Sequence, residues 1–330
     1  MTPPKPHGTL TVCITGGAGQ ISYSLLPLIA SGEVFGHEQP IELRLLDIKP
    51  ALEALNGVVM ELHDCSFPLL RGIVATDDPM VAFRHADVAV LAGSFPRRPG
   101  MERRELLAKN VNIFKAHGHA LDQVASKNVK IVVVGNPSNT NALVLSHFAP
   151  SIPKGNITAL TRLDHNRTVS QVALRTGVSV NDVDGVAIWG NHSATQYPDM
   201  TRATAKGELA MPMLGGRKVV AEEIIPCIQK RGAAVLKARG FSSAMSAANA
   251  IGDHLRSWLM GDSKIVSMAV ASDGSYHVKA GVYFSFPVRC VGGGEYEIVQ
   301  GIELGEFSRK YVSATTEELF AEREEALSLL

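Results

Sequence analysis

The sequence LTVCITGGAGQIS, residues 10–22, indicates how the first half of this chain folds. Its apolar beginning predicts a strand over Leu10–Ile14, and its glycines predict a tight turn that leads into a helix over about 20–30. A second apolar strand follows and ends in Asp47. A strand, a glycine turn, a helix and a strand with a terminal carboxylate form the first half of a dinucleotide-binding βαβ unit.

The glycine turn and Asp47 together predict NAD as the bound dinucleotide. Glycines let the backbone approach a pyrophosphate, and the helix N-terminus offers it free N–H groups and a positive dipole. A carboxylate at Asp47 can accept both ribose hydroxyls and repels a 2′-phosphate, which disfavours NADP. The spacing Gly16-x-x-Gly19-x-x-Ser22 departs from the strict fingerprint at its third small position. A purely structural turn is the alternative interpretation of these glycines.

Length and composition narrow the class of protein. A chain of 330 residues exceeds the usual single-domain size, so we expect two domains. Lys plus Arg equals Asp plus Glu at 32 each, so no net charge favours nucleic acid or an anionic membrane. The four cysteines form no C-x-x-C pair, which favours buried fillers in a reducing compartment, and we expect no metal site. Without a signal peptide or a membrane span, the expected location is the cytoplasm.

Strand and helix patterns alternate through the first half of the chain. Short or fully apolar strands are predicted at 73–76, 87–92 and 130–134, and helices at 52–62, 105–126 and 138–148. This alternation predicts an α/β fold, a Rossmann-type doubly wound parallel sheet. We place a domain boundary near Ile157, which gives a NAD-binding domain over 1–157 and an α+β substrate-binding and catalytic domain over 158–330.

The second half mixes helices and strands. The patterns predict a helix over 163–176, a strand over 183–189, and helices over about 218–238 and 242–260. Three strands follow, at 265–271, 281–288 and 296–299. The last helix is predicted to open with a capping box, Thr315-x-x-Glu318.

Three residues of the second half suggest acid–base chemistry. His192 follows the strand over 183–189 in a Gly-Asn-His turn, and histidine can exchange a proton near neutral pH. Asp164 and Arg167 lie three apart on one face of a predicted helix. The simple interpretations are one unremarkable histidine among 11 and an intrahelical ion pair. In the functional interpretation, Asp164 orients His192 and Arg167 grips a substrate carboxylate.

Two further segments follow buried strands, where ligands bind in open α/β sheets. The loop over 93–104 carries four arginines, among them Arg97 and Arg103, and its closure would bring cations onto an anionic substrate and exclude water. Asn136, in a Gly-Asn-Pro turn, can donate from its amide to a carbonyl oxygen. The alternatives are a solvated charged loop and a plain Asn-Pro turn.

The assembled motifs resemble the malate dehydrogenases of the cytosolic type, within the lactate/malate dehydrogenase superfamily. The resemblance covers nearly the whole chain. It is carried by TGGAGQISYSLL (15–26), PRRPGMERRELL (96–107), GNPSNTNALV (135–144), TRLDHNR (161–167), WGNHSATQYPD (189–199), and RGAAVLKAR with FSSAMSAANAI (231–251).

The resemblance implies a role for each matching residue. It makes His192 the catalytic acid/base and Asp164 its orienting carboxylate. Of the arginines, Arg167 would bind the C1 carboxylate of malate or oxaloacetate, Arg97 the distal carboxylate and Arg103 the reacting carbonyl, while Asn136 would contact substrate and nicotinamide. The implied contacts to NAD are Gly16, Gly17, Ala18, Gly19, Gln20, Ile21, Ser22, Asp47, Asn110, His117, Val134, Gly135, Asn136 and Ser246.

Two departures from the family pattern affect the cofactor site. His117 stands where the family has a glutamine, and Ser22 where Gly or Ala is usual. The expected activity is reversible hydride transfer between malate and NAD by a homodimer, with no nucleic-acid or membrane partner. The alternatives are a dehydrogenase of lactate or aromatic 2-oxo acids, which Arg97 disfavours because a second cation suits a dicarboxylate, and a non-catalytic NAD-binding regulator.

Overall fold

The computed structural model describes residues 8–96 and 102–330, apart from the side chain of Arg103. Arg97 and its neighbour Arg98 therefore lie outside the described residues. Of the predicted arginine loop over 93–104, the described residues are 93–96 and 102–104. A helix begins at Arg103.

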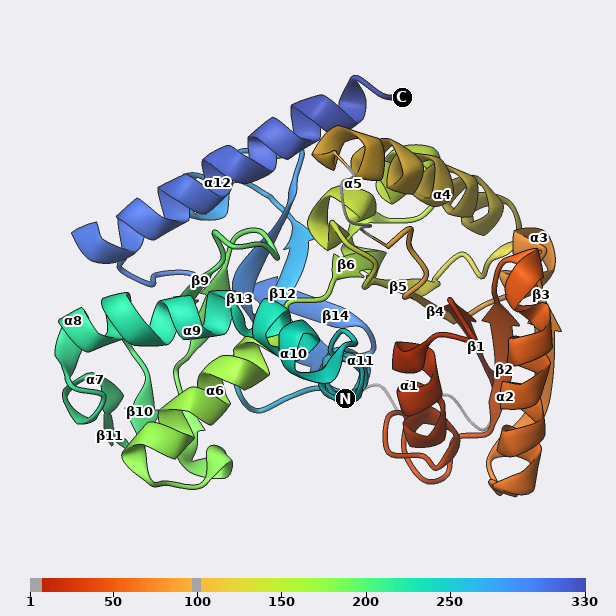
Figure 1. Cartoon of the computed structure of the whole chain (residues 1–330), viewed down its shortest axis with the longest axis horizontal. Helices are drawn as coiled ribbons and strands as arrows, with labels where there is room; N and C mark the ends of the chain where they lie inside the picture. Colours follow the sequence, from red (N-terminus) through yellow and green to blue (C-terminus); the bar gives the residue numbers. More distant parts are fainter. Residues whose placement is uncertain (1–7, 97–101) are drawn as a thin grey trace.

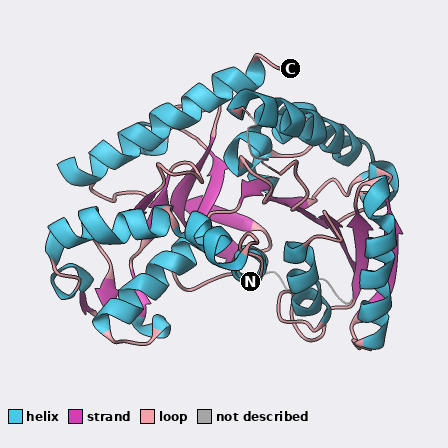
Figure 2. Ribbon diagram, in the orientation of Figure 1, coloured by secondary structure: helices cyan, strands magenta, loops and turns pink. Residues whose placement is uncertain are grey.

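A nine-stranded sheet runs through the described part of the molecule (Figures 1 and 2). Its strand order is β14-β13-β12-β6-β5-β4-β1-β2-β3. Strands β1 to β6 pair in parallel in the order 3-2-1-4-5-6, which is the order of a dinucleotide-binding doubly wound fold. The bounds are β1 Leu10–Thr15, β2 Ile41–Leu46, β3 Leu70–Thr76, β4 Val88–Leu91, β5 Lys130–Val133 and β6 Ile157–Ala159.

The sheet continues past β6 into the second half of the chain. Strands β12 (Val266–Ala271), β13 (Tyr283–Gly292) and β14 (Glu295–Ile298) are antiparallel to their neighbours. One residue pair, Ala269 with Ala159, joins β12 to β6. The two halves of the chain are therefore fused through one sheet.

Helices cover both faces of this sheet, because successive side chains of its strands point to opposite sides. Val12 and Ile14 of β1 pack in one apolar cluster with α1 (Gln20–Ala30), α2 (Leu52–Asp64) and α11 (Met245–Met260). Cys13, between them, belongs to a second cluster on the other face, with α3 (Pro79–Ala82), α4 (Arg103–Val124) and α5 (Ser138–Phe148). The predicted α/β architecture is confirmed, and the predicted bounds of α1 and α5 are those of the structure.

The remaining helices lie in the second half of the chain. α12 (Glu306–Leu327) crosses the edge of the molecule beside α5 and α4, and α6 (Arg162–Thr176) packs on α11 (Figure 1). Among the helices of the described ranges, none has the length and apolar character needed to cross a membrane. The shorter segments are α7 Ala210–Met213, α8 Gly216–Val219, α9 Ile225–Gln229 and α10 Arg231–Arg239, with a π-helical turn over Val220–Ile224.

Two predicted elements are interrupted in the structure. The strand predicted over 183–189 is two strands, β7 (Val183–Asp184) and β8 (Ala187–Trp189), in different sheets. Gly185 between them has φ +74°, a left-handed conformation that cannot continue a strand. The helix predicted over 218–238 is divided by the π-helical turn, which precedes Pro226, and by a turn at Lys230. Proline has no N–H to donate, so the regular ladder breaks there.

The predicted capping box is wrong. α12 already begins at Glu306, with Gly305 as its N-cap, so Thr315 and Glu318 lie in the middle of the helix. Thr315 is buried and Glu318 is half-buried. Both face the turn that follows β8, where their side chains accept hydrogen bonds. The three-residue spacing places Thr315 and Glu318 on one face of α12, and this face binds the turn after β8.

Candidate active site

A histidine, an aspartate and an arginine come together as predicted. Asp164 lies in the first turn of α6, and His192 lies in the turn after β8. The Nδ1 atom of His192 forms a short hydrogen bond with Oδ2 of Asp164. The other carboxylate oxygen of Asp164 accepts from Nη1 of Arg167 at 3.1 Å. Asp164 is fully buried, whereas the side chain of His192 is 21% exposed.

The charges of this group determine the protonation of His192. Burial alone would raise the pKa of Asp164, but the charges and hydrogen bonds of His192 and Arg167 outweigh it and lower that pKa. Burial alone would lower the pKa of His192, but the charge and hydrogen bond of Asp164 raise it. Asp164 therefore stays ionised and favours a protonated His192. Because Nδ1 is bonded to Asp164, Nε2 is the atom that can exchange a proton with a ligand.

The turn that carries His192 is held by a side chain of α5. Asn139 accepts the backbone N–H of His192 at 3.0 Å and donates to the carbonyl oxygens of Gly190, at 3.2 Å, and Tyr283, at 2.8 Å. Gly190 has φ +96°, and a Cβ there would lie 2.1 Å from a methyl carbon of Thr315. Only glycine fits at this position.

Asn139 and two further residues that surround the pair are not among the predicted site residues. Gln196, which is 3% exposed, hydrogen-bonds Asp164 and helps to lower its pKa. The Oγ of Ser243 accepts from Nη2 of Arg167 at 3.3 Å. Gln196 and Ser243 lie within motifs quoted above, but no local pattern shows which side chain they meet.

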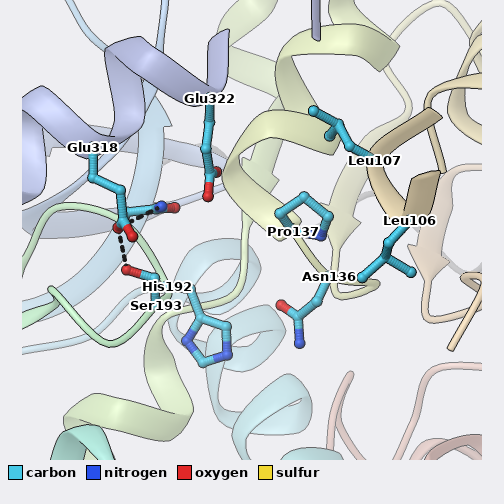
Figure 3. Close-up of a pocket in the computed structure, with 9 residues that line it drawn as sticks. Leu106, Leu107, Asn136, Pro137, His192, Ser193, Glu318 and Glu322 are labelled. Carbon is cyan, nitrogen blue, oxygen red and sulfur yellow. Dashed lines mark hydrogen bonds between the residues drawn. The ribbon is translucent and has the colours of Figure 1, made fainter. Parts of the chain in front are cut away.

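A cavity of about 280 Å³ opens beside His192 (Figure 3). His192 and Asn136 point into it from the turns after β8 and β5. Leu106, Leu107 and Pro137 supply apolar walls, and Glu318 and Glu322 reach it from α12. The structure therefore brings the predicted Asn136 to the same cavity as the acid–base histidine. Arg97 lies outside the described residues, and so does the side chain of Arg103.

The glycine turn forms a cradle at the carboxyl ends of β1 and β4, where the chain order reverses across the sheet. Gly16 has φ +68°, and a Cβ there would lie 2.9 Å from Cα of Gly93. The N-cap of α1 has no side-chain hydrogen bond, and the first turn of α1 has no acidic residue. The N–H groups and positive dipole of α1 are thus available to a pyrophosphate, so the residues present fit NAD.

Asp47 and Ser22 complete this cradle. One carboxylate oxygen of Asp47 accepts the N–H of Ala18 at 2.9 Å, and the other accepts the N–H of Ile48 at 2.8 Å. A carboxylate has about four acceptor sites, so the half-buried Asp47 keeps capacity for ribose hydroxyls. The fully buried Ser22 donates its hydroxyl to the carbonyl oxygen of Gly16 at 2.7 Å. The unusual serine therefore adds a hydrogen bond inside the turn.

The other predicted cofactor contacts lie in different surroundings. Asn110 is fully buried, and its amide bonds the backbone of Phe95 and Leu106. His117 packs edge-on against Phe83 and Phe114, and burial lowers its pKa to about 4, so it is neutral. The remaining predicted contacts are Gly17, Gly19, Gln20 and Ile21 around the start of α1, Val134 and Gly135 after β5, and the exposed Ser246 in the first turn of α11.

Within the described ranges, no group of three or more His, Cys, Asp or Glu side chains is placed to hold a metal ion.

Both halves of the chain match models of one protein family. Residues 10–158 match the NAD binding domain of lactate/malate dehydrogenase, and residues 161–330 match the alpha/beta C-terminal domain of the same family. The cytoplasmic malate dehydrogenase of Zea mays is 51% identical over 329 residues, covering 97% of this chain and 98% of its own. The malate dehydrogenase of Nicotiana tabacum is 52% identical over 330 residues, with the same coverage.

Solved structures of dehydrogenases superpose on nearly the whole of this chain. A malate dehydrogenase from Naegleria fowleri superposes with a TM-score of 0.96 at 46% identity, covering 98% of this chain and 99% of the other. A lactate dehydrogenase from Trichomonas vaginalis, in complex with NADH and oxamate, superposes with a TM-score of 0.93 at 38% identity, covering 97% and 99%.

Proposed function

The chain belongs to the lactate/malate dehydrogenase family, and we propose that it is an NAD-dependent malate dehydrogenase that interconverts malate and oxaloacetate. The observation that carries the proposal is the bonded Asp164–His192 pair beside Arg167, at the edge of a cavity that Asn136 also lines. Relatives that share about half of their residues with this chain are malate dehydrogenases, which supports the choice of substrate.

His192 exchanges the proton of the reaction. When malate is oxidised, the neutral imidazole takes the hydroxyl proton at Nε2, and Asp164 stabilises the imidazolium that forms. When oxaloacetate is reduced, protonated His192 returns the proton to the carbonyl oxygen. Bound NAD supplies the hydride acceptor, and bound NADH the hydride donor, for C2 of the substrate.

Cationic and amide side chains position the substrate. Arg167 donates to Asp164 through Nη1 and to Ser243 through Nη2. A guanidinium has five N–H donors in a planar fork, so Arg167 can also grip the C1 carboxylate. Asn136 donates its amide toward the reacting centre. In this proposal Arg97 binds the distal carboxylate and Arg103 polarises the reacting carbonyl, as the matching motif implies; neither side chain is among those described.

The cofactor is held by the cradle around Gly16, with Asp47 as acceptor for the ribose hydroxyls. We assign residues 1–157 to NAD binding and 158–330 to substrate binding and catalysis, a division that the gap between the two matched family regions supports. We further propose a cytoplasmic homodimer that acts on a small molecule, without nucleic-acid or membrane partners. The cytoplasmic relatives and the balanced charge support this part of the proposal.

A second candidate is a dehydrogenase of lactate or another monocarboxylic 2-hydroxy acid. The Trichomonas vaginalis lactate dehydrogenase that superposes on this chain favours it, because the fold and more than a third of the residues are shared. A non-catalytic NAD-binding regulator is disfavoured by the intact Asp164–His192 pair and Arg167.

The deciding experiment compares NADH oxidation by the purified protein with oxaloacetate, pyruvate and phenylpyruvate. We expect kcat/KM to favour oxaloacetate strongly. Arg97→Gln should lower kcat/KM for oxaloacetate by about a hundredfold or more, because a buried carboxylate would lose its charge partner, and should change pyruvate turnover far less. Preference for a monocarboxylate would overturn the substrate assignment, and equal losses on both substrates would contradict the role of Arg97.

A further inference from the structure

The catalytic turn, which we define as residues 190–196, is fastened to the C-terminal helix as well as to α5. We propose that Glu318 of α12 is a positioning residue for His192, acting through Asn191, Ser193 and Thr195. The inference rests on the proposed function, because it assigns the support of the same acid–base group. It also explains why the residues that resemble a capping box lie in mid-helix.

Three side chains of the catalytic turn donate to one oxygen atom. Oε2 of Glu318 accepts from the amide of Asn191 at 3.1 Å and from the hydroxyl of Thr195 at 2.6 Å. It also accepts from the hydroxyl of Ser193 in a shorter bond (Figure 3). These donors stand on both sides of His192 in the sequence. A single carboxylate thus fixes the two arms of the turn from which the imidazole projects.

Thr315, one helical turn before Glu318, supports the backbone of the same turn. Its hydroxyl oxygen accepts the N–H of Asn191 at 2.9 Å and lies 3.0 Å from the hydroxyl oxygen of Thr195, within hydrogen-bond distance. Its methyl group lies where a side chain at Gly190 would have to be. This close fit restricts how the catalytic turn can lie against α12.

A carboxylate suits this place better than a neutral acceptor. Hydrogen bonds to a charged oxygen are shorter and roughly twice as strong as neutral ones, and a carboxylate offers no donor that would compete with the three that converge on it. Glutamine keeps the shape and one acceptor oxygen but adds an N–H₂ group. It should therefore hold the turn partly, whereas alanine should not hold it at all.

Glu322, one turn later on α12, bonds α5, the other helix that holds the catalytic turn. It is 6% exposed and accepts from the hydroxyl of Thr140 at 2.9 Å. Thr140 follows Asn139, which binds the backbone of His192 from α5. Helix α12 therefore bonds both the catalytic turn and the helix that holds it from the other side, which keeps the two in register.

Loss of the Glu318 bonds should slow the chemical step and leave NADH binding unchanged. The bonds of Glu318 to Asn191, Ser193 and Thr195 hold the catalytic turn, whereas bonds among Gly16, Ser22, Ala18 and Asp47 hold the cofactor cradle. Loosening the turn would misplace Nε2 of His192 relative to the reacting oxygen, and misplacement by about 1 Å can cost about a hundredfold in rate. The binding of NADH, which depends on the glycine turn, should be unaffected.

The test compares steady-state kinetics of the full-length wild type with Glu318→Ala, Glu318→Gln and the control Glu317→Ala. Glu317 is the exposed neighbour on the same helix turn, bonded to Ser313. We expect Glu318→Ala to lower kcat for oxaloacetate reduction by about ten- to a hundredfold, with the KM for NADH within about twofold of wild type. Glu318→Gln should recover part of the loss, and Glu317→Ala should match wild type.

Thermal unfolding and NADH fluorescence titration of each variant separate positioning from stability. A kcat for Glu318→Ala within about twofold of wild type would overturn the inference, and so would a parallel loss of kcat, NADH affinity and folded protein. Equal losses in the Gln and Ala variants would show that the acceptor oxygen is not what holds the turn. If the wild type fails to reduce oxaloacetate, the proposed function fails; the ratio of variant to wild type on whichever 2-oxo acid is reduced still tests Glu318.

Discussion

The cofactor turn, residues 16–22, and the catalytic turn, residues 190–196, are built in opposite ways. The cofactor turn is held by its own residues and by the end of the next strand. Gly19 and Ser22 both donate to the carbonyl oxygen of Gly16, and Asp47 accepts the N–H of Ala18. The catalytic turn is held by side chains of α5 and α12 that are far from it in the sequence. Binding of a common cofactor can thus be encoded locally, whereas placing a proton donor requires several distant segments to agree.

The largest expected effect comes from removing the group that the catalytic turn presents. His192→Asn keeps a polar side chain of similar size but cannot exchange a proton near neutral pH, so we expect kcat to fall by about 10²- to 10⁴-fold. The cofactor turn is unchanged, so NADH should bind as in the wild type. Stopped-flow turnover and NADH fluorescence titration measure the two quantities. Turnover near wild type in this variant would refute the assignment of His192.

This difference between the turns also explains what the sequence could predict. The bounds of α1 and the place of Asp47 follow from apolar periodicity, glycine and a strand end, which are all local signals. The break at Gly185 could not be predicted in this way. It results from a positive φ, which a glycine permits but does not require.

The supports of the catalytic turn could not be predicted in the same way. Asn139 lies in a polar helix start, Gln196 in a strand-like stretch, and Glu318 in an acidic helix. Each has an ordinary local interpretation, and Thr315-x-x-Glu318 even has a wrong one. Their roles become visible only when the fold brings His192 to them, because a hydrogen bond between residues far apart in sequence leaves no periodic pattern.

A second, intermediate effect tests the electrostatic link inside the catalytic site. Reduction of oxaloacetate needs protonated His192, so the rate should fall as pH rises through the pKa of His192. The charge of Asp164 raises that pKa. In Asp164→Asn the charge is gone while burial, which lowers the pKa, remains. The fall should therefore move to lower pH by about one to three units, in addition to a loss of rate.

The pH dependence of kcat/KM for oxaloacetate measures this shift for the free enzyme. Asp253→Asn is a suitable control, because Asp253 bonds Asn166 and Asn249 outside the acid–base pair. An unchanged midpoint in Asp164→Asn would mean that another group controls the protonation of His192, and the coupling drawn from the short Asp164–His192 hydrogen bond would be wrong.

The smallest expected effect comes from removing the hydroxyl of Ser22 in the cofactor turn. Ser22→Ala removes a buried hydroxyl that donates to the carbonyl oxygen of Gly16 at 2.7 Å, but that oxygen keeps the N–H of Gly19 at 2.9 Å. One net hydrogen bond of this kind corresponds to about a two- to tenfold rise in the KM for NADH, with kcat unchanged. Ser24→Ala, which removes an exposed hydroxyl bonded to the carbonyl oxygen of Gln20, should change neither.

Either result for Ser22→Ala sharpens the contrast between the two turns. A raised KM for NADH would mean that the serine, unusual at this position, compensates for its greater bulk by fixing the carbonyl that starts the turn. An unchanged KM would contradict that role and leave the glycines, the N-terminus of α1 and Asp47 as the groups that form the cradle. The cofactor turn would then depend on none of its own side chains, whereas the catalytic turn depends on side chains from two distant helices.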